Sequence, residues 1–220
     1  MLSDLQKLAI HQFEQLVIKK PEQKNCGGQL FIGKHYAKND ILFLGAVPSL
    51  NDDSTFNTEL MDTNILLESS SVKRHQKNAS VAFGYDSELK TKLSMATFSY
   101  LCPFRVAKWN DVNKLKQDTL LEYSRPILNK ILTQCQPKYI IVSGMYSIDI
   151  LLGHYPDIFT DAKELEMVTL DRPHRWSEYG SVVNGQPVRI LKAPNFSYAS
   201  NKNKLREFSH WLSHKIDGSL

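Results

Sequence analysis

The sequence lacks the features of membrane, secreted and disulfide-linked proteins. None of its apolar runs approaches the ~18 to 20 residues needed to cross a bilayer, and the longest, residues 41–47, has the length of a buried strand. The first residues lack the basic and apolar segments of a secretory signal. The three cysteines, Cys26, Cys102 and Cys135, are far apart and odd in number, which argues against a disulfide framework. We therefore expect a cytoplasmic protein without membrane contacts.

Common metal and cofactor motifs are also missing. The cysteines form no C-x-x-C pair, and His210 and His214, four residues apart, have no neighbouring Glu of the H-E-x-x-H kind. There is no glycine-rich dinucleotide motif and no phosphate-binding P-loop. No Gly-x-Ser-x-Gly frame surrounds Ser143, which disfavours a serine hydrolase. The sequence thus predicts no metal site and no cofactor.

Charge and composition favour one globular domain. The 220 residues are 42% hydrophobic and 23% charged, and 27 Lys and Arg against 23 Asp and Glu leave a net charge of +4. A mildly basic balance permits nucleic-acid binding without requiring it. We predict a single domain over residues 1–220, with an N-terminal helix at about 3–20 and a polar insertion at about 48–80.

Hydrophobic spacing predicts alternating helices and strands. The helices are expected at residues 4–18, 87–93, 120–135, 145–152 and 201–215. The strands are expected at residues 41–45, 96–101, 139–142, 167–170, 179–183 and 187–191, and the tight turn Asn184-Gly185 joins the last two. Within the expected helix at 120–135, Pro126 marks either a kink or a later start. Alternation of this kind indicates an α/β fold, and the unbroken apolar runs indicate central parallel strands.

Three of these strands run into segments of unusual composition. Residues 45–53, 100–105 and 192–198 each follow an apolar strand, and each contains a proline that makes the turn rigid. Ligands of open α/β sheets bind beyond the carboxyl ends of the strands. These segments are therefore the candidate binding region.

Their order and spacing resemble the uracil-DNA glycosylase superfamily over about residues 41–214. The strand ending in Gly-x-x-Pro at Gly45 and Pro48 is similar to its water-activating motif. Ser99-Tyr100 followed by Pro103-Phe104-Arg105 is similar to its Thr-Asn strand end and Pro-x-Arg turn, and the helix, strand and Gly144 at 120–144 are similar to the next unit. Residues 189–198, with Pro-x-x-Ser, are similar to its closing His-Pro-Ser motif and minor-groove loop.

The resemblance implies a three-layer α/β/α sandwich around a short, mainly parallel sheet. Members flip a damaged base out of duplex or single-stranded DNA and cut its N-glycosidic bond with water. On this basis Asp52 or Asp53 would activate water. The base would contact Val47, Phe56, Tyr100 and Asn195, with Phe56 stacking on it. Contacts to the DNA strand would come from Arg105, Phe196, Ser197 and Tyr198.

Three residues depart from the family's pattern. Val47 stands where Asp or Asn usually holds the water, and Ala193 replaces the His that donates to the leaving base. Tyr100 replaces the Asn that reads the base edge. Together these substitutions argue against ordinary uracil excision. The alternatives are a catalytically inactive glycosylase fold that binds nucleic acid or protein, and a hydrolase of free nucleotides or nucleosides.

Each of these assignments has a structural alternative. Asp52 and Asp53 also suit a solvated turn, Phe56 a core position and Arg105 a structural ion pair. The basic run at 73–77 is either a DNA contact or solvated surface. Residues 195–198 form either a groove-entering loop or a packed turn. The charged and aromatic loop at 171–176 either contacts phosphates or seals the sheet edge by cation–π packing.

Overall fold

The structure is a computed structural model that describes residues 2–20, 28–29, 40–46, 56–57, 74–104, 114–143, 147–171, 174–196 and 198–218. Its helices are α1 (Leu2–Lys19), α2 (Arg74–Gly84), α3 (Ser87–Ser94), α4 (Lys114–Cys135), α5 (Ser147–His154) and α6 (Lys202–Asp217). Its strands are β1 (Gly28–Gln29), β2 (Ile41–Gly45), β3 (Phe56–Asn57), β4 (Thr97–Tyr100), β5 (Tyr139–Ser143), β6 (Thr160–Thr169), β7 (Arg175–Val183) and β8 (Gln186–Lys192).

Six strands form one mixed sheet in the order β4-β2-β5-β8-β7-β6. The first four are parallel to one another, whereas β7 is antiparallel to both β8 and β6. The prediction of a short, mainly parallel sheet is therefore wrong, because two antiparallel strands of nine and ten residues extend it on one side. The turn at Asn184 and Gly185, with φ of 51° and 76°, sends β8 back against β7.

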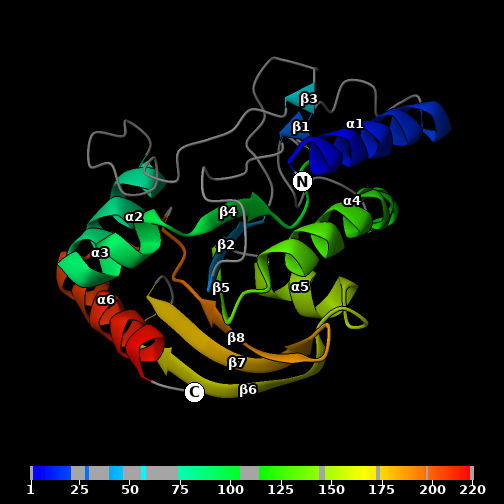
Figure 1. The fold of residues 1–220 in the computed structure, drawn as a ribbon. Coiled ribbons are helices and arrows are strands. Elements are labelled where there is room, and N and C mark those ends of the chain that lie inside the picture. The colour runs from blue at the N-terminus through cyan, green and yellow to red at the C-terminus, as the bar shows by residue number, and fades with distance from the viewer. Residues whose placement is uncertain are drawn as a thin grey trace.

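Helices cover both faces of the sheet, which confirms an α/β/α arrangement of three layers (Figure 1). One apolar core lies between the sheet and helices α1, α4 and α5, and the other lies between the sheet and helices α2, α3 and α6. The central strand β5 contributes to both cores, with Ile140 and Val142 on the α4 side and Ile141 on the α6 side. Burial on both faces explains why the sequence of this strand shows no alternation.

Most of the predicted elements are present, with shifted ends. Helix α4 begins at Lys114 and continues through Pro126, so this proline is neither the start of the helix nor its end. Helix α2 lies partly within the stretch expected to be a polar insertion, and β6 begins seven residues earlier than expected. No helix in the described part of the chain is long and apolar enough to span a bilayer.

Candidate functional site

The strand order brings the three candidate segments to one edge of the sheet. Gly45, at the end of β2, is paired with Tyr100 of β4 on one side and Ser143 of β5 on the other. Beyond the strands, the amide of Leu101 donates to the Gly45 carbonyl at 2.9 Å. The amide of Ala193 donates to the Val142 carbonyl at 2.8 Å. The carboxyl ends of all four parallel strands therefore form one continuous edge.

Four residues of this edge, Tyr100, Gly45, Ser143 and Ala193, lie on the sheet face that α6 covers, and we call them the Tyr100 shelf. Their positions follow from the alternation of side chains along each strand, since Ile141, two residues before Ser143, belongs to the α6-side core. Three of the four side chains are small. The shelf is thus one aromatic ring beside a row of small residues.

The Tyr100 ring lies directly over Gly45. A Cβ atom on Gly45 would be 2.8 Å from Cε1 and 2.9 Å from Cδ1 of Tyr100, which is closer than real Cβ contacts. Glycine at the end of β2 is therefore required for the tyrosine to occupy this position.

Other aromatic rings set the orientation of Tyr100. Its ring packs edge-on against Phe98 at 5.4 Å between centroids, and Phe98 stacks on Phe43 at 5.5 Å. Phe43 in turn meets Phe83 of α2 edge-on at 5.5 Å. Aromatic pairs at such distances stabilise fixed ring geometries. The rings of Phe83, Phe43, Phe98 and Tyr100 thus form a row from the α6-side core to the shelf. Tyr100, at the end of this row, is half-buried.

The segment after β8 forms the other end of the shelf. The side-chain amide of Asn78 on α2 donates to the Phe196 carbonyl at 2.8 Å. The amides of Tyr198 and Ala199 both donate to the Asn195 carbonyl, which closes a turn. The Tyr198 side chain is 62% exposed, whereas Asn195 is partly buried. Of these two predicted contact residues, Tyr198 is therefore the more accessible.

Phe196 is a correction to the sequence prediction. Its side chain is only 4% exposed and meets Phe83 edge-on at 5.4 Å and Phe208 of α6 at 6.1 Å. A ring packed in this way is not available to contact DNA. The two alternatives for residues 195–198, a packed turn and a groove-entering loop, therefore hold for different residues. Phe196 is packed in the core, whereas Tyr198 lies at the surface.

Tyr100 of β4 and Ala193 at the end of β8 mark the two ends of the shelf. Three strand-to-strand steps separate β4 from β8, and at ~4.8 Å each they amount to roughly 14 Å. The Tyr100 ring covers Gly45 and occupies part of this interval. The prediction that Tyr100 and Asn195 contact one base therefore requires that the base lie beyond the Tyr100 ring, on the Ser143 side.

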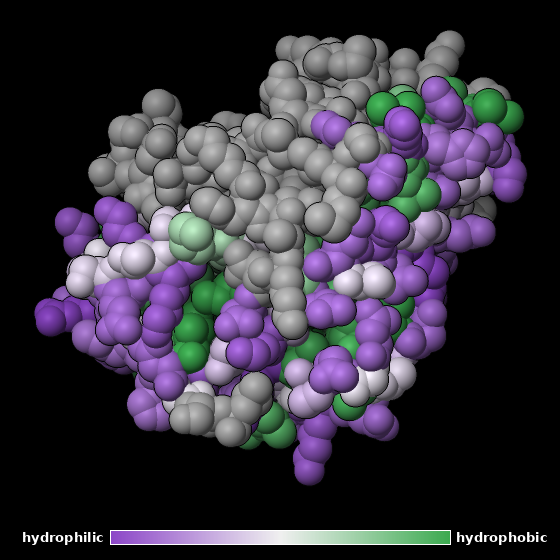
Figure 2. Space-filling model, viewed as in Figure 1, coloured by the Kyte–Doolittle hydropathy of each residue, from purple (hydrophilic) through white to green (hydrophobic). Residues whose placement is uncertain are grey.

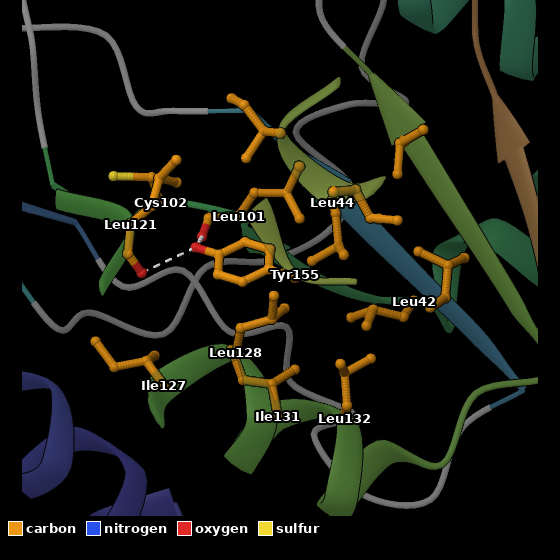
Figure 3. Packing of buried hydrophobic residues seen from close by; sticks show 14 of the residues in the cluster. Leu42, Leu44, Leu101, Cys102, Leu121, Ile127, Leu128, Ile131, Leu132 and Tyr155 are labelled. Atoms are coloured by element: carbon orange, nitrogen blue, oxygen red, sulfur yellow. Dashed lines mark hydrogen bonds between the residues drawn. The ribbon is translucent and has the colours of Figure 1, made fainter. Parts of the chain in front are cut away.

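A buried tyrosine that the sequence analysis did not single out supports this edge from the opposite face. The Tyr155 hydroxyl lies 3.3 Å from the Leu101 carbonyl and 3.2 Å from the Leu121 carbonyl (Figure 3). Tyr155 is fully buried, and burial raises its pKa well above the ordinary value, so the hydroxyl is a donor. It joins the end of α5 to α4 and to the turn after β4. No local sequence signal distinguishes it from other core aromatics.

Two described residues of the loop at 171–176, Asp171 and His174, tie this loop to helix α6. Asp171 accepts hydrogen bonds from the His174 ring, with Nδ1 at 2.6 Å, and from Lys204 of α6. The Lys204 and His174 contacts lower the pKa of Asp171 to about 2. The Asn201 amide donates to Nε2 of His174 at 3.3 Å, so the ring proton is on Nδ1. The loop therefore fixes the start of α6; the cation–π contact of this region is Lys215 over Trp211.

Several predicted site residues lie outside the described part of the chain. These are the proposed catalytic Asp52 and Asp53, and Val47, Arg105 and Ser197. Phe56 is described only as backbone of β3, where it pairs with Gly28. Among the described residues, no group of three or more His, Cys, Asp or Glu side chains is arranged to hold a metal ion. The chain matches no protein-family model and no curated protein.

Proposed function

We propose that this protein recognises a nucleobase in DNA at the Tyr100 shelf, as a divergent uracil-DNA glycosylase-like domain of the cytoplasm. The observation that carries the proposal is the meeting of three motif segments at one carboxyl edge, with Tyr100 fixed over Gly45. Edges of this kind are where α/β sheets bind ligands. A planar tyrosine ring held by other rings is suited to stacking or edge contact with a base.

The reaction that fits this site is hydrolysis of the N-glycosidic bond of a damaged or non-standard base. Asp52 or Asp53 would orient and deprotonate the attacking water. The base, flipped out of its strand, would lie on the shelf with Tyr100 at one end and Asn195 at the other. Exposed Tyr198, with Arg105 and Ser197, would hold the strand. No redox chemistry is needed.

Incision of modified oligonucleotides tests the activity. Single- and double-stranded oligonucleotides with uracil, hypoxanthine, xanthine or an oxidised base should acquire alkali-labile sites, and Asp52→Asn or Asp53→Asn should abolish them. Tyr100→Ala should weaken substrate binding at least tenfold, whereas the matched control Tyr85→Ala, outside the shelf, should not. Wild-type protein that leaves the whole panel uncut would exclude the glycosylase activity for these bases.

A second function, DNA binding without catalysis, is favoured by the chemistry of the shelf itself. Ala193, at the position of the family's donor to the leaving base, is buried and has no polar group. None of the four shelf side chains is a carboxylate or an imidazole. This alternative predicts that DNA binds with a steep salt dependence and that Tyr100→Ala weakens binding while no base is released.

A further inference from the structure

A pair of basic residues lies on the other face of the same sheet edge. Lys192 of β8 is paired with Ser177 of β7, and Arg175 is two residues before Ser177 on β7. Alternation therefore places Lys192, Ser177 and Arg175 on one face, and it is the face opposite Ala193 and the shelf. Residues in such diagonal positions across two antiparallel strands are within reach of each other's long side chains.

Neither cation is in an ion pair with a described residue, although the carboxylates of Asp149 and Glu164 act on Lys192. Lys192 and Arg175 form no ion pair and no side-chain hydrogen bond with any residue that the structure describes. Their neighbours on the α6 face differ: Arg189 pairs with Glu178, and Lys215 pairs with Glu166 at 2.7 Å and Glu178 at 2.6 Å. Proteins rarely bury a lysine fully without a counter-charge, because desolvating the ammonium group is costly, and Lys192 is half-buried.

The surroundings of Lys192 raise the cost of its charge. Burial lowers the pKa of Lys192, and the nearby Arg175 acts in the same direction, while Asp149 on α5 and Glu164 on β6 oppose them. Glu164 accepts a hydrogen bond from the neutral Tyr179 hydroxyl at 2.9 Å and keeps its negative charge. An anion placed between Lys192 and Arg175 would compensate both charges.

We propose that Lys192 and Arg175 bind a phosphate group beside the shelf. Both groups are the usual protein ligands of phosphate, Arg through a planar fork and Lys as a point charge. Lys192 and the shelf residue Ala193 are adjacent at the carboxyl edge, so a DNA strand that passes around the end of β8 could place a base on the shelf and a neighbouring phosphate at this pair on the opposite face. The DNA origin of the phosphate rests on the proposed function, while the anion site does not.

Phosphate affinity tests the site directly. Titration of the protein with inorganic phosphate and pyrophosphate should shift the backbone amide NMR signals of Ser177 and Lys192. Lys192→Gln and Arg175→Gln should abolish these shifts, and Lys192→Arg should retain them. Lys163→Gln is the control, because Lys163 is paired with Gly180 and so lies on the opposite face of the same hairpin. Lys192→Gln should fold with an unchanged or higher urea midpoint, since it removes an uncompensated charge.

DNA binding at several salt concentrations identifies the source of the phosphate. With single-stranded DNA, Lys192→Gln and Arg175→Gln should each reduce the salt slope of log K by about 0.7, and Lys163→Gln should leave it unchanged. Phosphate binding without DNA binding would support the anion site and assign it to free nucleotides. The same result would overturn the proposed function. DNA binding with wild-type slopes in both variants would overturn the anion site alone, and binding of neither ligand would overturn both.

Discussion

Gly45 is the residue on which the geometry of the Tyr100 shelf depends most directly. Because a Cβ atom there would lie 2.8 Å from the Tyr100 ring, Gly45→Ala should displace the ring and reduce the free energy of unfolding by about 1–3 kcal/mol. In a Tyr100→Ser background, Gly45→Ala should reduce the free energy of unfolding much less. Urea unfolding of the wild type, the two single variants and the double variant measures this coupling. Additive effects, within about 0.5 kcal/mol, would contradict the close contact.

The Tyr155 hydroxyl is the second residue whose contribution can be isolated. Tyr155→Phe keeps the packed ring but leaves the Leu101 carbonyl without this buried donor, so the free energy of unfolding should fall by about 1–2 kcal/mol. Tyr198→Phe is the matched control, because its side chain is exposed and should change stability by less than ~0.5 kcal/mol. Equal stability of Tyr155→Phe and wild type in urea would show that the hydroxyl contributes nothing.

At the scale of elements, the sequence predicts those strands and helices whose buried residues recur at regular spacing. The helix at 87–93, the strand at 139–142 and the Asn184-Gly185 turn were all readable, because burial and turn chemistry are local signals. Helix α2 is not predicted by the sequence, because its first turns are polar and its buried residues are Ala79, Ala82 and Phe83 near its end. The predicted length of strand β6 is too short because β6 is a largely exposed edge strand without hydrophobic alternation.

The candidate site shows the same division between local and long-range information. Strand ends and prolines indicated which segments meet at the carboxyl edge, and pairing of Gly45 with Tyr100 agrees with that expectation. The burial of Phe196 was not predictable, because its partners, Phe83 and Phe208, are distant in sequence. For the same reason the Lys192 and Arg175 pair was not predictable, since it depends on the register of β7 against β8.

One buried carboxylate, Glu178, helps to attach α6 to the sheet. It is 2% exposed and bonds to Lys215 of α6 and to Arg189 of β8. Glu178→Gln keeps the shape but removes the charge, and it should lower the free energy of unfolding by about 1–3 kcal/mol because Arg189 loses its carboxylate partner and Lys215 keeps only Glu166. Glu207→Gln, on the exposed face of α6, is the control. Hydrogen exchange should rise first in α6; faster exchange in α4 instead would contradict this role.

For the whole molecule, hydrophilic side chains dominate the visible described surface, and apolar ones gather in smaller patches between them (Figure 2). Ion pairs at the surface join elements that are distant in sequence. Lys92 of α3 pairs with Asp217 at the end of α6, and Arg125 of α4 pairs with Asp157 beyond α5. Exposed pairs of this kind contribute little individually. The hydrogen bond from Arg125 nevertheless lowers the pKa of Asp157, which makes stability depend on pH.

Acid should therefore destabilise the protein over a defined range. Hydrogen bonds from Lys204 and His174 lower the pKa of Asp171 to about 2, and a hydrogen bond from Arg125 lowers that of Asp157. Burial would raise the pKa of Glu178, but Lys215 and Arg189 outweigh it and hold the pKa below its ordinary value.

A carboxyl group with a lowered folded-state pKa stabilises the fold fully above its unfolded value and loses that contribution as pH falls through the folded one. The free energy of unfolding in urea should be constant from pH 7 to about 5 and should fall from about 4.5 toward 2. Asp171→Asn should flatten the lowest part of this curve. A stability that is unchanged between pH 5 and 2 would show that these carboxylates are not held by their cationic partners in solution.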